Sequence, residues 1–91
     1  MAFLLGVFDT GDFDAWKQMF DSDPAGRAQS GQGHRVFRSA DDPNRAFISV
    51  EFASADEANT FRERLLASGA LDKVTVATEP TVAELVDETR Y

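Results

Sequence analysis

A single histidine is the side chain best suited to proton transfer at neutral pH. The chain contains one His, His34, at the start of a predicted strand, and an unperturbed imidazole titrates near pH 6.5. In the tightest turn register His34 faces Glu51 of the next strand, and a two-residue shift places it opposite Ala53. A carboxylate partner would orient the ring and raise its basicity. His34 is therefore a candidate general base; the alternative is a half-exposed histidine that begins a strand.

Three further polar side chains are predicted to project from the same face of the sheet. Arg38 is a candidate for holding a carboxylate or enolate oxygen of a ligand. Glu51 is a candidate for abstracting a proton from a carbon acid, if burial raises its pKa, and Ser49 is a candidate ligand-binding residue. The alternative is that Arg38 and Glu51 neutralise each other, because buried charges are usually paired.

Aromatic side chains are candidates for the wall of a ligand cavity. Trp16 follows Phe13 at helical spacing, and Phe47 belongs to an alternating strand. Trp16 and Phe47 are therefore predicted to bind ligand together with Ser49. The alternative is that the aromatic residues at helical spacing form ordinary hydrophobic core.

The residue types exclude several chemistries. The chain has no Cys, which excludes disulfides, thiolate catalysis and Cys-based zinc sites. Residues 21–26 imitate the start of a calcium-binding loop, but two of the oxygen ligands are missing. No dinucleotide fingerprint and no nucleophile elbow occurs. We therefore expect neither a bound metal nor a cofactor.

The charge balance restricts the partners. Sixteen acidic and nine basic residues give a net charge of −7, which disfavours nucleic acid and anionic membrane surfaces. The apolar run at residues 3–8 is short and has no basic residue before it, so we read it neither as a signal peptide nor as a membrane span. These features predict a cytoplasmic protein.

The apolar periodicity predicts four strands and three helices in the order β-α-β-β-α-β-α. Asp12 and Ser54 are predicted helix N-caps, the latter within a capping box that ends at Glu57. A second capping-box pattern at residues 81–84 predicts a C-terminal helix. The strands are expected at residues 3–8, 34–39, 46–52 and 73–77, and the helices at residues 13–21, between Ser54 and Gly69, and from 81 to about 90.

This order predicts the fold class. Residues 1–91 are expected to form a single domain, because a chain of this length does not divide into two stable cores. Two split β-α-β units give a ferredoxin-like α+β fold. Its βαββαβ core forms an antiparallel four-stranded sheet with both long helices on one face, and the predicted C-terminal helix follows.

The second face of the sheet predicts a homodimer. An even-length connection at residues 41–44 places Phe37 beneath the helices with the apolar face of the next strand. The opposite face then carries His34, Val36, Arg38, Phe47, Ser49 and Glu51, joined by apolar residues of the first strand. Burying one large apolar side chain is worth roughly 1.5–3 kcal/mol, whereas association costs roughly 4–15 kcal/mol. Two sheets are therefore expected to pair face to face; the alternative is that the C-terminal helix covers this face.

Several segments resemble a known superfamily. The stretches Asp12–Lys17 (DFDAWK), Arg35–Asn44 (RVFRSADDPN) and Ser54–Ala58 (SADEA) are similar to small proteins of the dimeric α+β barrel superfamily. The closest likeness is to the short bacterial "cyclase" group near the antibiotic-biosynthesis monooxygenases, and it covers residues 3–79. The resemblance implies two sheets packed into a barrel, with a pocket between sheet and helices in each subunit.

Two functions follow as hypotheses. The first is a cofactor-free cyclase-like or monooxygenase-like enzyme or binder for a small aromatic or enolisable carbonyl compound, with His34, Arg38 and Glu51 as catalytic residues. The second is a non-catalytic dimeric structural or ligand-sensing module. A cavity of roughly 300 Å³ or more would favour the first hypothesis.

Overall fold

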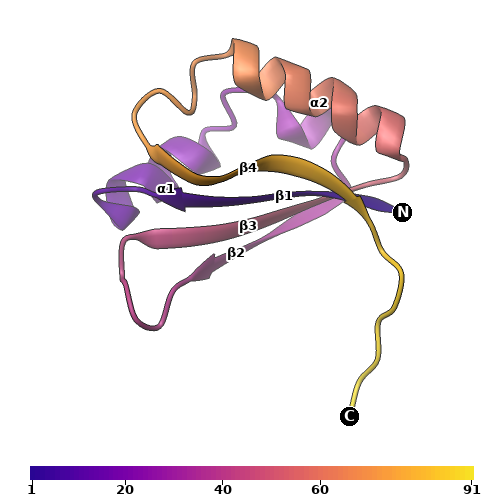
Figure 1. Ribbon diagram of the computed structural model, residues 1–91. Helices are drawn as coiled ribbons and strands as arrows, with labels where there is room; N and C mark the ends of the chain where they lie inside the picture. Colours follow the sequence, from indigo (N-terminus) through magenta and orange to yellow (C-terminus); the bar gives the residue numbers. More distant parts are fainter.

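The computed structural model describes residues 1–91 as a four-stranded sheet with two α-helices (Figure 1). A short 3-10 helix, Arg27–Gln29, lies between the first helix and the second strand. Neither α-helix has the length and apolar character needed to cross a membrane. The elements are β1 (Ala2–Asp9), α1 (Phe13–Asp21), β2 (Gly33–Arg38), β3 (Arg45–Phe52), α2 (Ala55–Ala67) and β4 (Thr75–Glu84).

The sheet is antiparallel throughout, with strand order β2-β3-β1-β4. Both α-helices lie on one face of it, with α2 above the strands and α1 at the left in Figure 1, and the other face carries no helix. This arrangement confirms the predicted ferredoxin-like α+β fold.

Local signals define the helix ends as predicted. The Asp12 carboxylate accepts a hydrogen bond from the Ala15 backbone N–H at 3.1 Å, and the Ser54 hydroxyl accepts one from the Glu57 N–H at 3.2 Å. Each cap satisfies a backbone donor that the first helical turn leaves free. Gly69 follows α2 with a φ of 77°, the left-handed conformation typical of a residue after a helix C-terminus.

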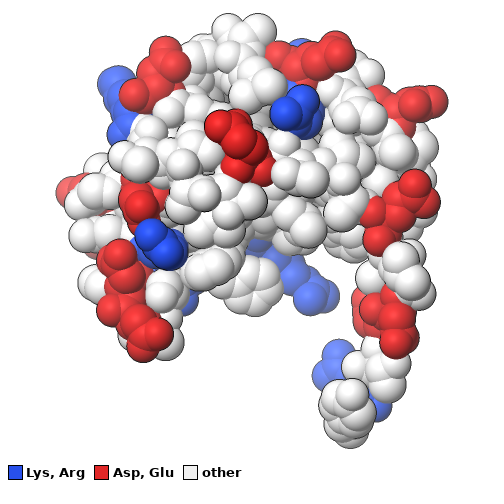
Figure 2. Space-filling view, viewed as in Figure 1, with Lys and Arg blue, Asp and Glu red and all other residues white.

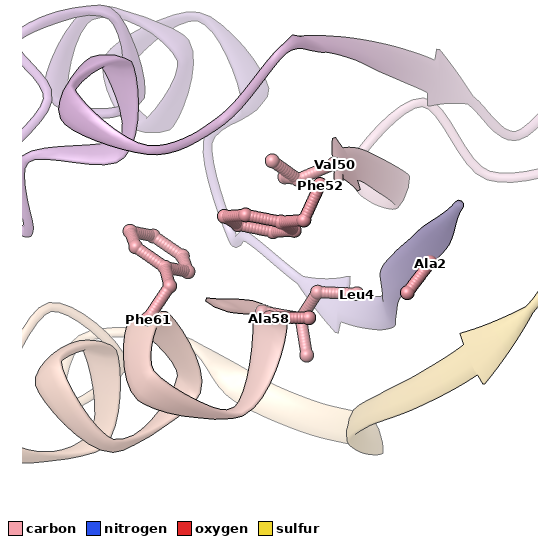
Figure 3. Close-up of a cluster of buried hydrophobic side chains, with 6 residues drawn as sticks. All are labelled: Ala2, Leu4, Val50, Phe52, Ala58 and Phe61. Carbon is pink, nitrogen blue, oxygen red and sulfur yellow. The ribbon is translucent and has the colours of Figure 1, made fainter. Parts of the chain in front are cut away.

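The core lies between the sheet and α2. Alternate residues of β1 and β3 point toward the helices, as the period of two along a strand requires. Figure 3 shows Phe61 of α2 pointing toward Phe52 of β3, and the two ring centroids are 5.5 Å apart. The buried cluster consists of Ala2, Leu4, Val50, Phe52, Ala58 and Phe61.

The predicted C-terminal helix is wrong. Residues 81–84 instead continue β4, which pairs with the whole length of β1. Pro80 does not end the strand, because the register shifts between Leu5 and Val7 leave it in a β-bulge, where a residue without an N–H is tolerated. Beyond Glu84 the chain leaves the sheet as a tail on the side away from the helices (Figure 1).

The predicted register of β2 is also wrong. His34 lies opposite Val50, and Gly33 is the residue opposite Glu51. The hairpin closes at Ser39, whose N–H donates to the Arg45 carbonyl at 2.9 Å, so an odd number of residues separates the closing pair. A shift of one residue moves every side chain of a strand to the other face.

The uncovered face of the sheet is consequently more apolar than expected. Phe37 lies on this face and is 52% exposed, beside Phe47 at 39% and Leu5 at 41%. The sequence predicted Phe37 beneath the helices, and this prediction is wrong because of the same one-residue error in the register of β2. We call this surface the open face; its large apolar side chains are Phe3, Leu5, Val7, Phe37 and Phe47.

Candidate functional site

The predicted site residues fall into two groups on opposite faces of the sheet. His34 and Arg38 alternate with Phe37 along β2 and therefore face the helices. Trp16, in α1, is on the helix side too. Phe47, Ser49 and Glu51 point to the open face. The predicted register that pairs His34 with Glu51 is therefore wrong, and so is a neutralising pair of Arg38 with Glu51 within one subunit, because the two residues lie on opposite faces of the sheet.

An apolar cavity of about 60 Å³ lies between the helices and the sheet. Trp16 lines it and is only 6% exposed. Its indole contacts Phe20 with ring centroids 5.2 Å apart. The only charged residues that border this space are Asp23 and Arg27. The lining residues are Phe8, Trp16, Met19, Phe20, Asp23, Pro24, Ala25, Arg27, Ile48, Val50, Phe61, Leu65, Ala70 and Leu71.

His34 lies at the outer edge of this aromatic cluster. Its imidazole stands edge-on to Phe20, with centroids 5.1 Å apart and an interplanar angle of 79°. Loss of hydration lowers the pKa of His34 below its ordinary 6.5, and the positive charges of Arg27 and Lys17 lower it further. These effects favour the neutral form of the imidazole, which is the form able to accept a proton.

The pair formed by Asp23 and Arg27 is a feature that the sequence-based prediction missed. One carboxylate oxygen of Asp23 accepts from the Arg27 backbone N–H at 2.6 Å, and the other accepts from the Ala28 N–H at 3.0 Å. Partial burial opposes ionisation, but these hydrogen bonds and the nearby Arg27 and Arg64 charges hold the pKa of Asp23 below 3.8. The sequence signal that could have revealed this pair is the spacing of four residues between the acidic Asp23 and the basic Arg27.

The Arg27 side chain folds back over α1. Its guanidinium carbon lies 3.8 Å from the centroid of the Phe20 ring, a cation–π contact. Phe20 thus has the guanidinium on its face and the imidazole of His34 against it. The three side chains bring a cation and a neutral base to one side of the apolar cavity.

Arg38 occupies a different position on the helix side. Its guanidinium carbon lies 5.3 Å from the Phe13 ring centroid, and Phe13 in turn packs against Trp16 at 5.6 Å. The ring of Phe13 therefore lies between Arg38 and Trp16 of the cavity wall. It is not among the residues that line the cavity.

The open face carries a second, polar hollow of about 220 Å³. Ser49 and Glu51 line it together with Arg35 of β2 and Glu88 of the tail. His34 lines this hollow as well, so this residue borders both the polar hollow and the aromatic cluster on the helix side. No three histidine or acidic side chains converge anywhere in the structure in the manner of a metal site.

Comparison with known proteins identifies the fold. No protein-family profile matches the sequence, and no curated protein is significantly similar to it. A solved structure assigned as an antibiotic biosynthesis monooxygenase from Deinococcus radiodurans superposes with a TM-score of 0.73, at 14% identity, covering 100% of this chain and 98% of that one.

Two further structures with the same assignment agree. The protein from Nitrosomonas europaea gives a TM-score of 0.60 at 15% identity, over 90% of this chain and 83% of that one. The protein from Bordetella bronchiseptica gives 0.52 at 19% identity, over 97% of both chains. The chain therefore has the ferredoxin-like α+β fold of these proteins, which confirms the predicted resemblance at the level of the fold.

Proposed function

We propose that this protein is a homodimer that binds a small aromatic or enolisable carbonyl compound and removes a proton from it without a cofactor. The observation that carries the proposal is the position of His34. The β2 register turns this single histidine toward the helix side, where Phe20 connects it to the apolar cavity walled by Trp16. The names of the structural neighbours support a monooxygenase-like reaction.

Proton transfer is the chemistry that these side chains support. A general base is most effective when its pKa lies near or below the working pH, so that it is unprotonated. His34 meets this condition, since its pKa lies below 6.5. The anion left on the substrate would be stabilised by the positive charge of Arg27 beside the imidazole. The same deprotonation initiates cyclase-like and monooxygenase-like reactions, so it does not depend on which product forms.

The second face of the sheet supports the homodimer. The five large apolar side chains of the open face have no covering element, and each is worth roughly 1.5–3 kcal/mol when fully buried. A two-fold dimer buries every one of them twice, which exceeds an association cost of roughly 4–15 kcal/mol. In this arrangement Phe47, Ser49 and Glu51 belong to the subunit interface, and we no longer assign them to the proton-transfer site.

The small volume of the cavity favours a second candidate. Ligand pockets usually measure about 300–1,000 Å³, whereas the apolar cavity here measures about 60 Å³. A dimer with a nearly filled interior would act as a non-catalytic structural or ligand-sensing module, cytoplasmic in either case. The two proposals differ in whether a compound enters beneath Trp16.

The fluorescence of Trp16 distinguishes the two candidates, because it is the only Trp in the chain. We would titrate the protein with a panel of small phenols and 1,3-dicarbonyl compounds and follow its emission. For any 1,3-dicarbonyl compound that binds, exchange of its acidic C–H hydrogen for deuterium should be accelerated by the protein, and His34→Gln should abolish this acceleration. Arg90→Gln, a change in the tail, is the control. Unaltered emission with the whole panel would support the non-catalytic module.

A further inference from the structure

Arg27 stands between two separate hollows. On its inner side lies the apolar cavity of about 60 Å³. On its outer side lies a surface cleft of about 230 Å³, lined by Arg27, Ala28, Gly31, Gln32, Gly33 and His34. Neither alone reaches the roughly 300 Å³ at which ligand pockets begin, but joined they approach it. A ligand that passes Arg27 would therefore have its apolar part inside and its polar end in the cleft beside His34.

The guanidinium of Arg27 is largely buried but weakly partnered. Its side chain is only 13% exposed, and its shortest approach to the Asp23 carboxylate is 3.7 Å, which is beyond hydrogen-bond distance. Both Asp23 oxygens accept from backbone N–H groups instead. The only hydrogen bond that the guanidinium donates runs from Nη1 to the Phe20 carbonyl and is long, at 3.4 Å.

A shielded guanidinium whose one ion pair is long favours a further anionic partner. Charges withdrawn from water require a partner, and the planar guanidinium presents several N–H donors that match a carboxylate or a phenolate. The chain has sixteen acidic and nine basic residues, and the face seen in Figure 2 shows no continuous basic patch. Selective attraction of an anion at this point must therefore come from the local group and not from the net charge.

We propose that Arg27 is the specificity-determining residue of the cavity and binds the anionic head, a carboxylate or phenolate, of a ligand whose apolar body lies beneath Phe20. This inference rests on the proposed ligand-binding function and adds the chemical class of the ligand.

Benzoate and benzamide test the inference because they have nearly the same shape and differ in charge. Their affinities would be measured by calorimetry at neutral pH, with Trp16 emission as the local readout. The expected result is that benzoate binds about tenfold more tightly, the effect of one hydrogen-bonded charge of roughly 1.4 kcal/mol. Arg27→Gln should remove this preference by weakening benzoate binding more than benzamide binding, while Arg27→Lys should keep part of it.

Arg90→Gln is the matched control, since it removes one positive charge from the exposed tail and should leave the preference intact. Equal affinity for the two probes in the unaltered protein would overturn the role of Arg27 and leave the proposed cavity standing. Failure of both probes to bind or to change Trp16 emission would overturn both proposals. An undiminished preference in a folded Arg27→Gln variant would show that another group selects the anion.

Discussion

The imidazole of His34 stands edge-on to the ring of Phe20, with centroids 5.1 Å apart. His34 comes from β2 and Phe20 from the last turn of α1, so the contact joins the edge strand of the sheet to the helix layer. It places the only titratable side chain of the chain with an ordinary pKa near neutrality next to the apolar cavity. The first two predictions follow from this contact.

Shortening Phe20 should raise the pKa of His34. The Phe20 ring excludes water from one side of the imidazole, and this loss of hydration is the largest cause of the low pKa. In Phe20→Leu the pKa, measured from the imidazole proton resonances by NMR, should move back toward 6.5. Phe37→Leu, on the open face, should not change it. An unshifted pKa in Phe20→Leu would mean that Arg27 and Lys17 alone lower it.

The lowered pKa of His34 should make the folded protein less stable as the pH falls. The folded pKa of His34 lies below the unfolded value near 6.5, so the unfolded chain binds the proton more readily. The stabilisation of the neutral form is complete above pH 6.5 and is lost as the pH falls toward the folded pKa.

Melting temperatures of the unaltered protein and His34→Gln, compared between about pH 5 and 8, test this dependence. The loss of stability on acidification should be smaller in the variant. Asp21 and Asp23, which face His34 along with Lys17 and Arg27, are present in both proteins. Since the Asp23 pKa lies below 3.8, its protonation falls outside this range. Parallel curves for the two proteins would contradict the prediction.

A charge placed on the open face should separate the subunits. Phe47→Asp introduces a carboxylate among the apolar side chains proposed to be buried between two sheets, and burying it unpaired costs several kcal/mol. Light scattering coupled to size-exclusion chromatography should show a dimer for the unaltered protein and a monomer for the variant. Leu66→Asp is the control, because Leu66 is 46% exposed on α2. A monomeric unaltered protein at micromolar concentration would refute the dimer.

Removing the Arg62 side chain should destabilise the β4 bulge. Arg62 Nε donates to the Pro80 carbonyl at 2.6 Å, and Pro80 is fully buried. Arg62→Ala leaves this carbonyl without its partner, which costs about 1–3 kcal/mol of unfolding free energy, measurable by urea denaturation. Glu63→Ala, at the next, exposed position of α2, should have an effect below about 0.5 kcal/mol. Equal effects would show that the hydrogen bond contributes little.

A methyl group at Gly6 should reduce the apolar cavity. A Cβ at Gly6 would lie 2.9 Å from Cζ of Phe8, so the Phe8 ring, which lines the cavity, must move. Gly6→Ala is expected to cost about 1–3 kcal/mol as overpacking and to weaken binding of any compound that quenches Trp16. Gly33→Ala meets no atom within 4 Å and should cost no stability through overpacking. Unchanged binding in Gly6→Ala would place the compound elsewhere.

The features that depend on near neighbours in the chain could be predicted from the sequence. Asp12 and Ser54 cap their helices by hydrogen bonds to residues three positions ahead, so residue type and spacing are sufficient signals. The alternation of Ala46, Ile48, Val50 and Phe52 likewise identifies the buried side of β3, because the period of a strand is invariant. These signals together determine the α+β class and the order of the elements up to the last strand.

The features that depend on distant partners were decided only by the tertiary structure. Residues 81–84 carry a helix-capping pattern, yet they pair with β1 and bring Val82 against the core, where burial outweighs a weak local preference. The β2 register follows from a hairpin loop whose Asn44 carbonyl accepts from both the N–H and the hydroxyl of Thr10.

The contact between Thr10 and Asn44 joins residues 34 positions apart. The loop between β2 and β3 that contains Asn44 has an odd length, which no local sequence pattern specifies. Because each one-residue shift exchanges the faces of a strand, this single difference decided that His34 meets Phe20 and not Glu51. The types of the chemically capable residues could thus be read from the chain. Which of them share a site was decided by long-range pairing, since the strand register determines the neighbours of each side chain.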